Sequence, residues 1–198
     1  LYDLEVTPMK KTLIAMSGGV DSSLAAKPDS QDICFVPDGD YAGVIEKHTG
    51  RRPVCGNFVD SSGNVLGRHK GVIHYTIGQR KGLGIAAAAP LYVCDICPNT
   101  NEVVLGSNEG LFRREADVTD FNWISGSAPA HELRCKAKIR YRHPEQWATV
   151  MPVGSDAVHI VFDEPQRAIT PGQAAVLYDG DTVLGGGVIQ KKTNGKDL

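Results

Sequence analysis

The sequence predicts three parts: an α/β nucleotide-binding domain that is largely missing, a small central module and a C-terminal antiparallel β-barrel. An apolar run at 13–16 leads into a glycine-bearing loop, which is typical of the first strand and turn of a nucleotide-binding domain. From residue 56 onward, short apolar runs alternate with Asn, Gly and Pro, which favours a barrel or sandwich. We place the boundaries at 1–35, 36–110, 111–190 and, for a short tail, 191–198.

Composition is consistent with this organisation and limits the function. The 198 residues are 41% hydrophobic and 22% charged, as in ordinary globular proteins, and the net charge of −2 indicates no particular partner. No apolar run approaches the roughly 20 residues that span a bilayer, and no signal peptide is recognisable. The five cysteines are an odd number in a chain without an export signal. We therefore expect a cytoplasmic protein with free thiols and no membrane contact.

The first element is a strand followed by the loop "SGGVDS". Its glycines let backbone N–H groups approach an anion, Ser17 and Ser22 add hydroxyl donors, and Asp21 is suited to hold Mg²⁺. The loop lacks the Gly-Lys-Ser/Thr of a Walker motif and resembles the PP-loop of ATP pyrophosphatases. This resemblance implies an ATP site, with Mg²⁺ carried by the nucleotide, at Ala15, Met16, Ser17, Gly18, Gly19, Val20, Asp21 and Ser22.

The nucleotide-binding domain ends too early. Each βαβ unit takes about 30 residues, yet the pattern breaks between Ala26 and Lys27. Domain sizes predict that a segment on the order of a hundred residues is missing at this junction, either deleted or disordered. The chain as printed is therefore expected to be incomplete and, alone, not catalytically competent.

The central module is expected to begin with a short helix and to continue as strands. The helix is predicted at 40–47, with Asp40 as its N-cap and Gly50 just past its end. Strand pairs follow in 56–67 and in 90–106, and the barrel strands are expected within 133–142, 147–153, 156–162 and 174–189. Asp179-Gly180 marks a hairpin in the last of these segments.

The segment "RCKAKIRYR" carries a basic residue at every second position. In a strand these five side chains share one face, spaced about 6.6–7 Å apart, with no acid among them. Such a stripe fits the phosphates of a nucleic acid, and it equally fits an edge strand protected by charge against pairing. The stripe consists of Arg134, Lys136, Lys138, Arg140 and Arg142.

Several longer motifs resemble the tRNA-specific 2-thiouridylase family. In the family's order they are "SGGVDSS", "DSQDICF", "GVIHYTIGQRKGLG", "YRHPEQ" and "TPGQAAVLYDGDTVLGGG", and they cover about residues 10–190. The resemblance implies ATP-dependent 2-thiolation of the wobble uridine of tRNA, by adenylation of its C2 oxygen and sulfur transfer from a cysteine persulfide. Cys34 matches the cysteine that carries the sulfur, which a cysteine desulfurase or another sulfur-delivery protein supplies.

The resemblance also implies tRNA contacts and a second cysteine. The family's Arg-Tyr pair matches Arg140-Tyr141, and its glutamine matches Gln173. Because Tyr141 would face away from Arg140 in a regular strand, we expect a bend or strand end there. The family's other catalytic cysteine, which assists sulfur release or forms a disulfide with the first, has no match here, and neither does its Lys-Asp-Gln stretch.

The remaining cysteines and one basic loop leave alternatives open. Cys94 and Cys97 have the spacing of a zinc pair, but strand alternation sends them to opposite faces, so no metal site is predicted. Cys55 and Cys135 lie in unrelated surroundings. The loop "GQRKGLG" at 78–84 is suited either to approach phosphate or to form a turn with incidental charge.

Two other functions compete with thiolation. One is another PP-loop ATP pyrophosphatase or ligase, which would share only "SGGVDS" with this chain. The other is a non-catalytic RNA-binding β-module. Release of AMP that depends on tRNA would distinguish the enzyme from the binding module.

Overall fold

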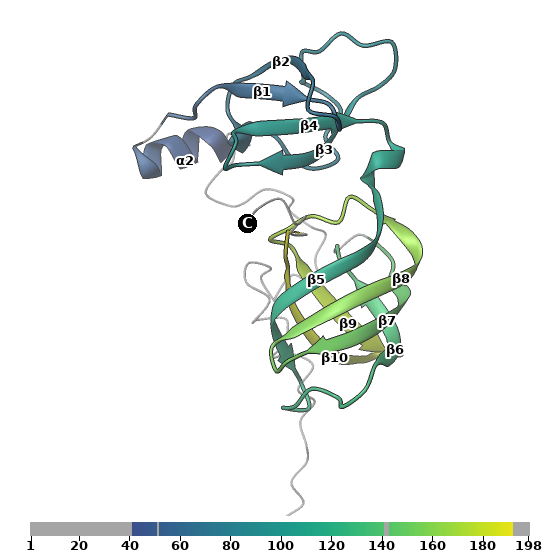
Figure 1. Cartoon of the computed structure of the whole chain (residues 1–198). Coiled ribbons are helices and arrows are strands. Elements are labelled where there is room, and N and C mark those ends of the chain that lie inside the picture. The colour runs from purple at the N-terminus through teal and green to yellow at the C-terminus, as the bar shows by residue number, and fades with distance from the viewer. Residues whose placement is uncertain (1–40, 51, 141–142, 192–198) are drawn as a thin grey trace, which may run out of the picture. The chain divides into compact units, whose positions relative to one another are not determined.

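The computed structural model describes residues 41–50, 52–140 and 143–191. The described chain forms two compact units that meet in sequence at Phe112 and Arg113 (Figure 1). The central module and the barrel predicted from the sequence are both confirmed. The predicted ATP-binding residues 15–22, the Ala26–Lys27 junction, Cys34, Asp40, Tyr141 and Arg142 lie outside the described residues.

In its described residues, the first unit contains one helix, two short 3₁₀ turns and a four-stranded sheet in the order β2-β1-β4-β3. Strand β1 runs parallel to β4, while the β1–β2 and β3–β4 pairs are antiparallel. The elements are α2 (Tyr41–Thr49), β1 (Gly56–Val59), β2 (Val65–His69), η2 (Val72–His74), β3 (Tyr92–Cys97), β4 (Glu102–Gly106) and η3 (Glu109–Leu111).

Helix α2 ends at Thr49, two residues beyond the predicted end, and Gly50 lies just past it as the sequence predicts. Gly50 has a φ of 65°, and its N–H donates to the carbonyl of Glu46 at 2.8 Å, which closes the last turn. A glycine in this left-handed conformation is a common helix stop because it carries no Cβ to clash. Lys47 and His48 lie in the last turn, where positive charge favours the negative end of the helix dipole.

The turn between β1 and β2 is held by one carboxylate. Asp60 Oδ1 accepts hydrogen bonds from the backbone N–H groups of Ser62 and Asn64, and Oδ2 accepts one from the Asn64 amide. These bonds favour the ionised form and lower the pKa of Asp60, the Asn64 side chain having the largest effect. The predicted pair of strands in 56–67 is thereby confirmed.

A small apolar cluster supports this sheet. Phe58, Val93, Val103 and Leu105 are buried on one face, and Leu83 packs into the cluster from the long segment before β3. The ring of Tyr75 meets that of Phe58 edge-on at 5.1 Å between centroids. The segment between η2 and β3 is therefore anchored to the sheet, although it contains no strand.

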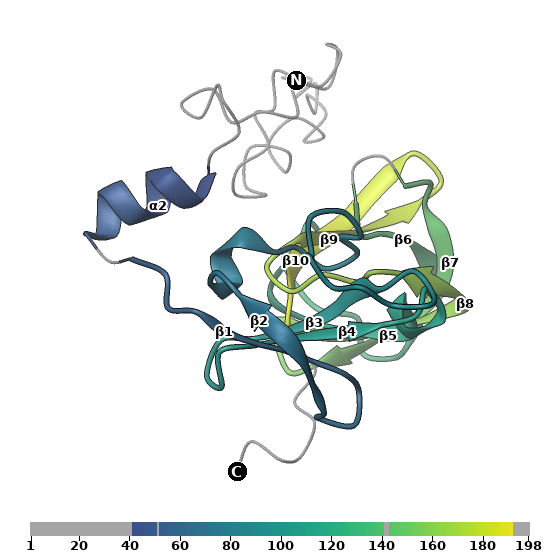
Figure 2. The same ribbon diagram turned by 90° about the horizontal axis from the view of Figure 1, so that it is seen from above.

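The second unit is a closed antiparallel barrel of six strands in the order β10-β5-β8-β7-β6-β9 (Figures 1 and 2). Alternate residues point inward, as expected for a barrel wall. Its strands are β5 (Phe112–Trp123), β6 (Leu133–Lys138), β7 (Gln146–Val153), β8 (Ala157–Arg167), β9 (Ala174–Asp179) and β10 (Thr182–Ile189).

The predicted hairpin is observed between β9 and β10. Asp179 pairs with Thr182, so Gly180 and Asp181 are the two central residues of the turn. Gly180 has a φ of 53°, which suits the first central position of a tight hairpin.

Strand β5 was not predicted from the sequence. Ala116 and Val118 point inward, but the next buried residues are Phe121 and Trp123, so the two-residue period slips by one. The slip occurs at Asp120, which has a φ of 50° and adds a residue to the strand. Because the alternation breaks there, the segment does not read as one strand.

No helix in the described part of the chain is long and apolar enough to cross a membrane.

Candidate nucleic-acid interface

Strand β6 presents its basic residues on the outside of the barrel. Arg134, Lys136 and Lys138 point outward, while Cys135 and Ala137 are buried in the core, as the alternation predicted. The strand is hydrogen-bonded to β7 on one side and to β9 on the other. The charges therefore do not protect an open edge, and that interpretation of the stripe is wrong.

Two of these cations are neutralised by neighbouring acids, which the sequence reading did not foresee. The guanidinium of Arg134 forms a two-pronged pair with Asp163 of β8, with Nη1 at 2.6 Å from Oδ1 and Nη2 bonded to Oδ2. The Nζ atom of Lys136 lies 2.7 Å from Oε1 of Glu145. Hydrogen bonding to Arg134 lowers the pKa of Asp163, and the same bond raises the pKa of Arg134.

An exposed aromatic residue lies beside these cations. Trp147 pairs with Lys136 in the β6–β7 register, and its side chain is 50% exposed. The Arg134 guanidinium carbon lies 5.4 Å from the indole centroid and the Lys136 Nζ lies 5.7 Å from it. An exposed aromatic next to cations is a feature of surfaces that stack nucleobases. The sequence analysis missed Trp147 because the pairing that places it is not visible in a single strand.

Arg140 connects the end of β6 to the loop after β8. The strand ends at Lys138, and Ile139 and Arg140 form the bend that the sequence predicted. The Nη2 atom of Arg140 donates to the carbonyl oxygen of Ala168 at 2.7 Å and to the hydroxyl of Thr170 at 2.9 Å. Burial lowers the pKa of Arg140, and nearby Arg167 lowers it further.

The loop that Arg140 holds also carries Gln173. Its side chain is exposed, while its backbone N–H bonds to Thr170 and its carbonyl accepts from Ile189 at 2.8 Å. Gly172, with a φ of 83°, makes the turn between them. Arg140 and Gln173, two predicted tRNA contacts 33 positions apart in the chain, are thus both hydrogen-bonded to Thr170. Together the three residues form one hydrogen-bonded assembly. Tyr141 and Arg142, which complete the predicted set, lie outside the described residues.

The cysteines of the described residues have different surroundings. Cys55 is exposed, whereas Cys135 is buried in the barrel core, where desolvation raises its pKa to about 11. Cys94 faces the segment of Gly106 and Gly110, and Cys97 Sγ lies 4.0 Å from Asp95. No group of three metal-ligating side chains occurs within the described ranges.

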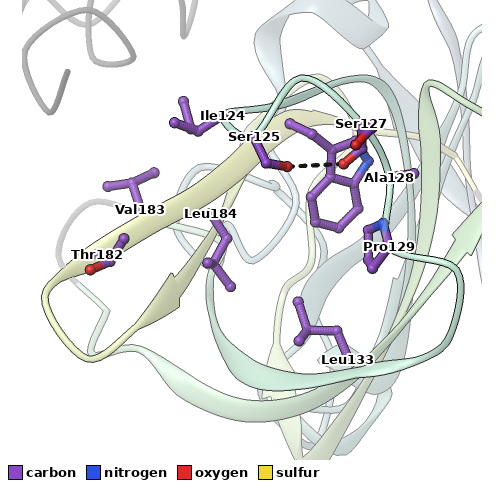
Figure 3. A pocket seen from close by; sticks show the side chains of 10 residues that line it. Ile124, Ser125, Ser127, Ala128, Pro129, Leu133, Thr182, Val183 and Leu184 are labelled. Atoms are coloured by element: carbon purple, nitrogen blue, oxygen red, sulfur yellow. Dashed lines mark hydrogen bonds between the residues drawn. The ribbon is translucent and has the colours of Figure 1, made fainter.

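A hollow of about 510 Å³ lies at one end of the barrel, between the loop after β5 and the start of β10 (Figure 3). Its wall is mostly apolar, with Pro129, Leu133 and Leu184 among the lining residues, and none of the lining residues is charged. The buried indole N–H of Trp123 has no hydrogen-bond partner among the described residues. None of the predicted site residues lines this hollow, so the candidate interface is the outer surface of the barrel.

Comparison with known proteins identifies both units. Residues 113–189 match the family described as "Aminomethyltransferase beta-barrel domain", and residues 42–107 match "tRNA methyl transferase PRC-barrel domain". The two matches correspond to the barrel and to the central unit with its helix.

Longer relatives match most of this chain. The tRNA-specific 2-thiouridylase MnmA of Clostridioides difficile (strain 630) is 55% identical over 165 residues, which are 83% of this chain and 46% of the relative. The protein of the same name from Lachnoclostridium phytofermentans is 46% identical over 202 residues, 96% of this chain and 57% of the relative. That of Acetivibrio thermocellus is 52% identical over 167 residues, 84% of this chain and 46% of the relative. The chain spans about half the length of these relatives. It belongs to the tRNA-specific 2-thiouridylase family.

Proposed function

We propose that this chain is part of an ATP-dependent tRNA sulfurtransferase that converts the wobble uridine to 2-thiouridine. The names of its relatives support this activity. Within the described residues, the observation that carries the proposal is the hydrogen-bonded assembly of Arg140, Thr170 and Gln173, because it holds a cation and an exposed amide together on the barrel surface.

The assembly suits RNA for electrostatic and geometric reasons. Nη2 of Arg140 is occupied by the loop, while Nη1 makes no hydrogen bond to any described residue and remains available to a phosphate oxygen. A guanidinium fixed in this way loses little side-chain entropy when it binds an anion. The Gln173 amide has both a donor and an acceptor, which suits a base edge or a ribose hydroxyl.

In the proposed reaction, the C2 oxygen of uridine attacks the α-phosphorus of ATP and pyrophosphate leaves. The terminal sulfur of a persulfide on Cys34 then attacks C2, and AMP leaves with the former oxygen. A second thiol attacks Sγ of Cys34, so the S–S bond breaks, the sulfur stays on uridine, and the two thiols are left as a disulfide. A thiolate is suited to this role because it is nucleophilic and can carry a second sulfur.

The ATP and sulfur steps are assigned to residues outside the described ranges. We assign the phosphates of ATP to the backbone and hydroxyl groups of residues 15–22, with Mg²⁺ near Asp21. We assign sulfur delivery to a cysteine desulfurase or a sulfur-carrier protein that meets Cys34. No position in this chain matches the second thiol of the family.

The proposal is tested with the protein expressed from its own gene, supplied with tRNA, ATP and a persulfide donor. We expect AMP release that depends on tRNA, and 2-thiouridine detected by mass spectrometry of the digested tRNA. Cys34→Ser should abolish thiolation and leave tRNA binding nearly unchanged, whereas Cys55→Ser should keep both. AMP release without tRNA would favour another ligase, and tRNA binding with no AMP would favour the RNA-binding module.

A further inference from the structure

The central unit contains a long segment that carries positive charge without any acidic residue. From residue 61 to residue 94 the chain has four Lys or Arg and two His, and no Asp or Glu. The four cations, which are Arg68, Lys70, Arg80 and Lys81, are all exposed. None of them forms an ion pair with another described residue, in contrast to Arg134 and Lys136 of the barrel. No ion pair among the described residues therefore neutralises the positive charge of this segment.

Two of these cations are adjacent residues of a braced loop. The side chain of Gln79 accepts from the backbone N–H of Thr76 and donates to the carbonyl of Lys81, both at 3.0 Å. Gly78 donates to the carbonyl of Val93 at 2.8 Å, and Val93 donates back to Gln79 at 2.9 Å, which fastens the loop to strand β3. Arg80 and Lys81 thus follow directly after residues that are hydrogen-bonded to strand β3 and to the loop itself.

The other end of the loop is fixed as well. Leu83 is buried in the core of the central unit. Gly82 and Gly84 have φ values of 77° and 69°, which shape the loop and leave it without bulky side chains beside the two cations. A large surface can therefore approach Arg80 and Lys81 closely.

We propose that the loop of residues 76–84 binds the phosphodiester backbone of the RNA substrate through Arg80 and Lys81. The inference rests on the proposed function, which supplies a polyanionic substrate, and it adds a second contact region to that of the barrel. Arg and Lys side chains supply many of the phosphate contacts of nucleic-acid-binding proteins, and such contacts fix position and orientation without reading bases. The contact therefore positions the RNA without selecting its sequence.

The test compares charge-matched double variants of the protein expressed from its own gene. For each protein, the dissociation constant for tRNA is measured at several salt concentrations. Arg80→Ala/Lys81→Ala should weaken binding at low salt about tenfold or more, and it should reduce the slope of log K against log[salt] by about 1.5, since each phosphate contact contributes about 0.7–0.9. Lys47→Ala/Arg52→Ala removes two exposed cations of the same unit and should leave both quantities near the wild-type values.

A second variant tests the brace. Gln79→Ala keeps both charges but releases Thr76 and Lys81, so the affinity should fall while the salt slope stays unchanged. Melting curves of all variants establish that they are folded.

The outcomes separate this inference from the proposed function. Wild-type affinity and slope in Arg80→Ala/Lys81→Ala, with tRNA-dependent AMP release intact, would overturn the loop contact and leave the enzyme assignment standing. An equal loss of slope in the Lys47/Arg52 control would also overturn it, because the effect would then be one of net charge. Failure of the wild-type protein to bind tRNA would instead refute the proposed function.

Discussion

Arg140 and Thr170 are joined by a hydrogen bond of 2.9 Å that spans 30 positions of the chain. The same guanidinium nitrogen also donates to Ala168, whose carbonyl in turn accepts from the Thr170 hydroxyl at 2.9 Å. Ala168 has a φ of 54°, an unfavourable conformation for a residue with a Cβ, so these bonds hold the loop in a shape it would not otherwise prefer.

Replacement of Arg140 should therefore affect both the loop and RNA binding. In Arg140→Lys a single ammonium replaces the planar group, so the charge is kept but the fixed geometry is lost. We expect tRNA affinity to fall about tenfold and the stability to drop by about 1–3 kcal/mol, because part-buried acceptors lose their donor. Filter binding and urea unfolding measure the two effects.

Thr170→Val is the matched control for this prediction. It removes the hydroxyl but leaves the Arg140 bond to Ala168, so it should lower stability less than Arg140→Lys. If Arg140→Lys bound tRNA as well as the wild type, the assembly could not be part of the interface.

Asp163→Asn should strengthen binding of tRNA. The substitution removes the acid that pairs with Arg134 and leaves that guanidinium exposed beside Trp147. An additional cation becomes available to phosphate. The slope of log K against log[salt] should therefore become steeper by about 0.7–0.9, the contribution of one phosphate contact. Asp181→Asn, in the exposed β9–β10 turn, removes the same charge and serves as the control. Equal gains in both variants would indicate a general effect of net charge.

The strands were predictable wherever one face is buried without interruption. Strand β6 and the first six residues of β8 alternate, because each wall residue of the barrel faces either the core or the solvent. Strand β5 escaped prediction because Asp120 adds a residue and shifts the inward-facing set by one. The first four residues of the strand are also all exposed, so the 12 residues show no continuous alternation.

The candidate site was less predictable, for a related reason. The sequence shows which residues of β6 point outward, and the structure bears this out. It does not show which side chains of the neighbouring strands meet them. Trp147 and Glu145, which lie in β7 and just before it, reach the cations because β7 pairs with β6; Asp163 reaches Arg134 from β8, the next strand beyond β7.

Cys135 should be unreactive in the folded protein. Its thiol is buried and its pKa is raised from 9.0 to about 11, so little thiolate forms at neutral pH and reagents have no access. Iodoacetamide labelling followed by mass spectrometry should modify exposed Cys55 rapidly and Cys135 only after unfolding. Because the unfolded thiol ionises at lower pH, the stability that this group contributes is lost as pH rises above about 9. Equal labelling of the two cysteines under native conditions would contradict the buried position.

Gly187→Ala should destabilise the barrel. A Cβ at this position would lie 2.6 Å from the carbonyl oxygen of Thr119 and 2.9 Å from a methyl carbon of Val118, and the backbone oxygen cannot move without disturbing β5. We expect a loss of about 1–3 kcal/mol, typical of overpacking, measured by urea unfolding. Gly154→Ala is the comparison, because Gly154 has open space around it and a φ of 70°. A loss of stability in this variant would come from backbone strain and not from a steric clash.

The last prediction concerns His69, which makes the stability of the central unit depend on pH. Its Nδ1 accepts from the N–H of Gly71 at 3.0 Å and its Nε2 faces the carbonyl of Asn101 at 3.2 Å, an arrangement that requires the neutral ring. Burial lowers the pKa of His69 below the ordinary 6.5. The unfolded chain therefore binds more protons than the folded one, and stability falls as pH drops through about 6.5 until the folded ring itself titrates. Urea midpoints measured at about pH 8 and about pH 5.5 should differ. His69→Gln, whose amide can both accept and donate, should reduce that difference, whereas His48→Gln on the exposed end of α2 should not. An undiminished pH dependence in His69→Gln would show that another group is responsible.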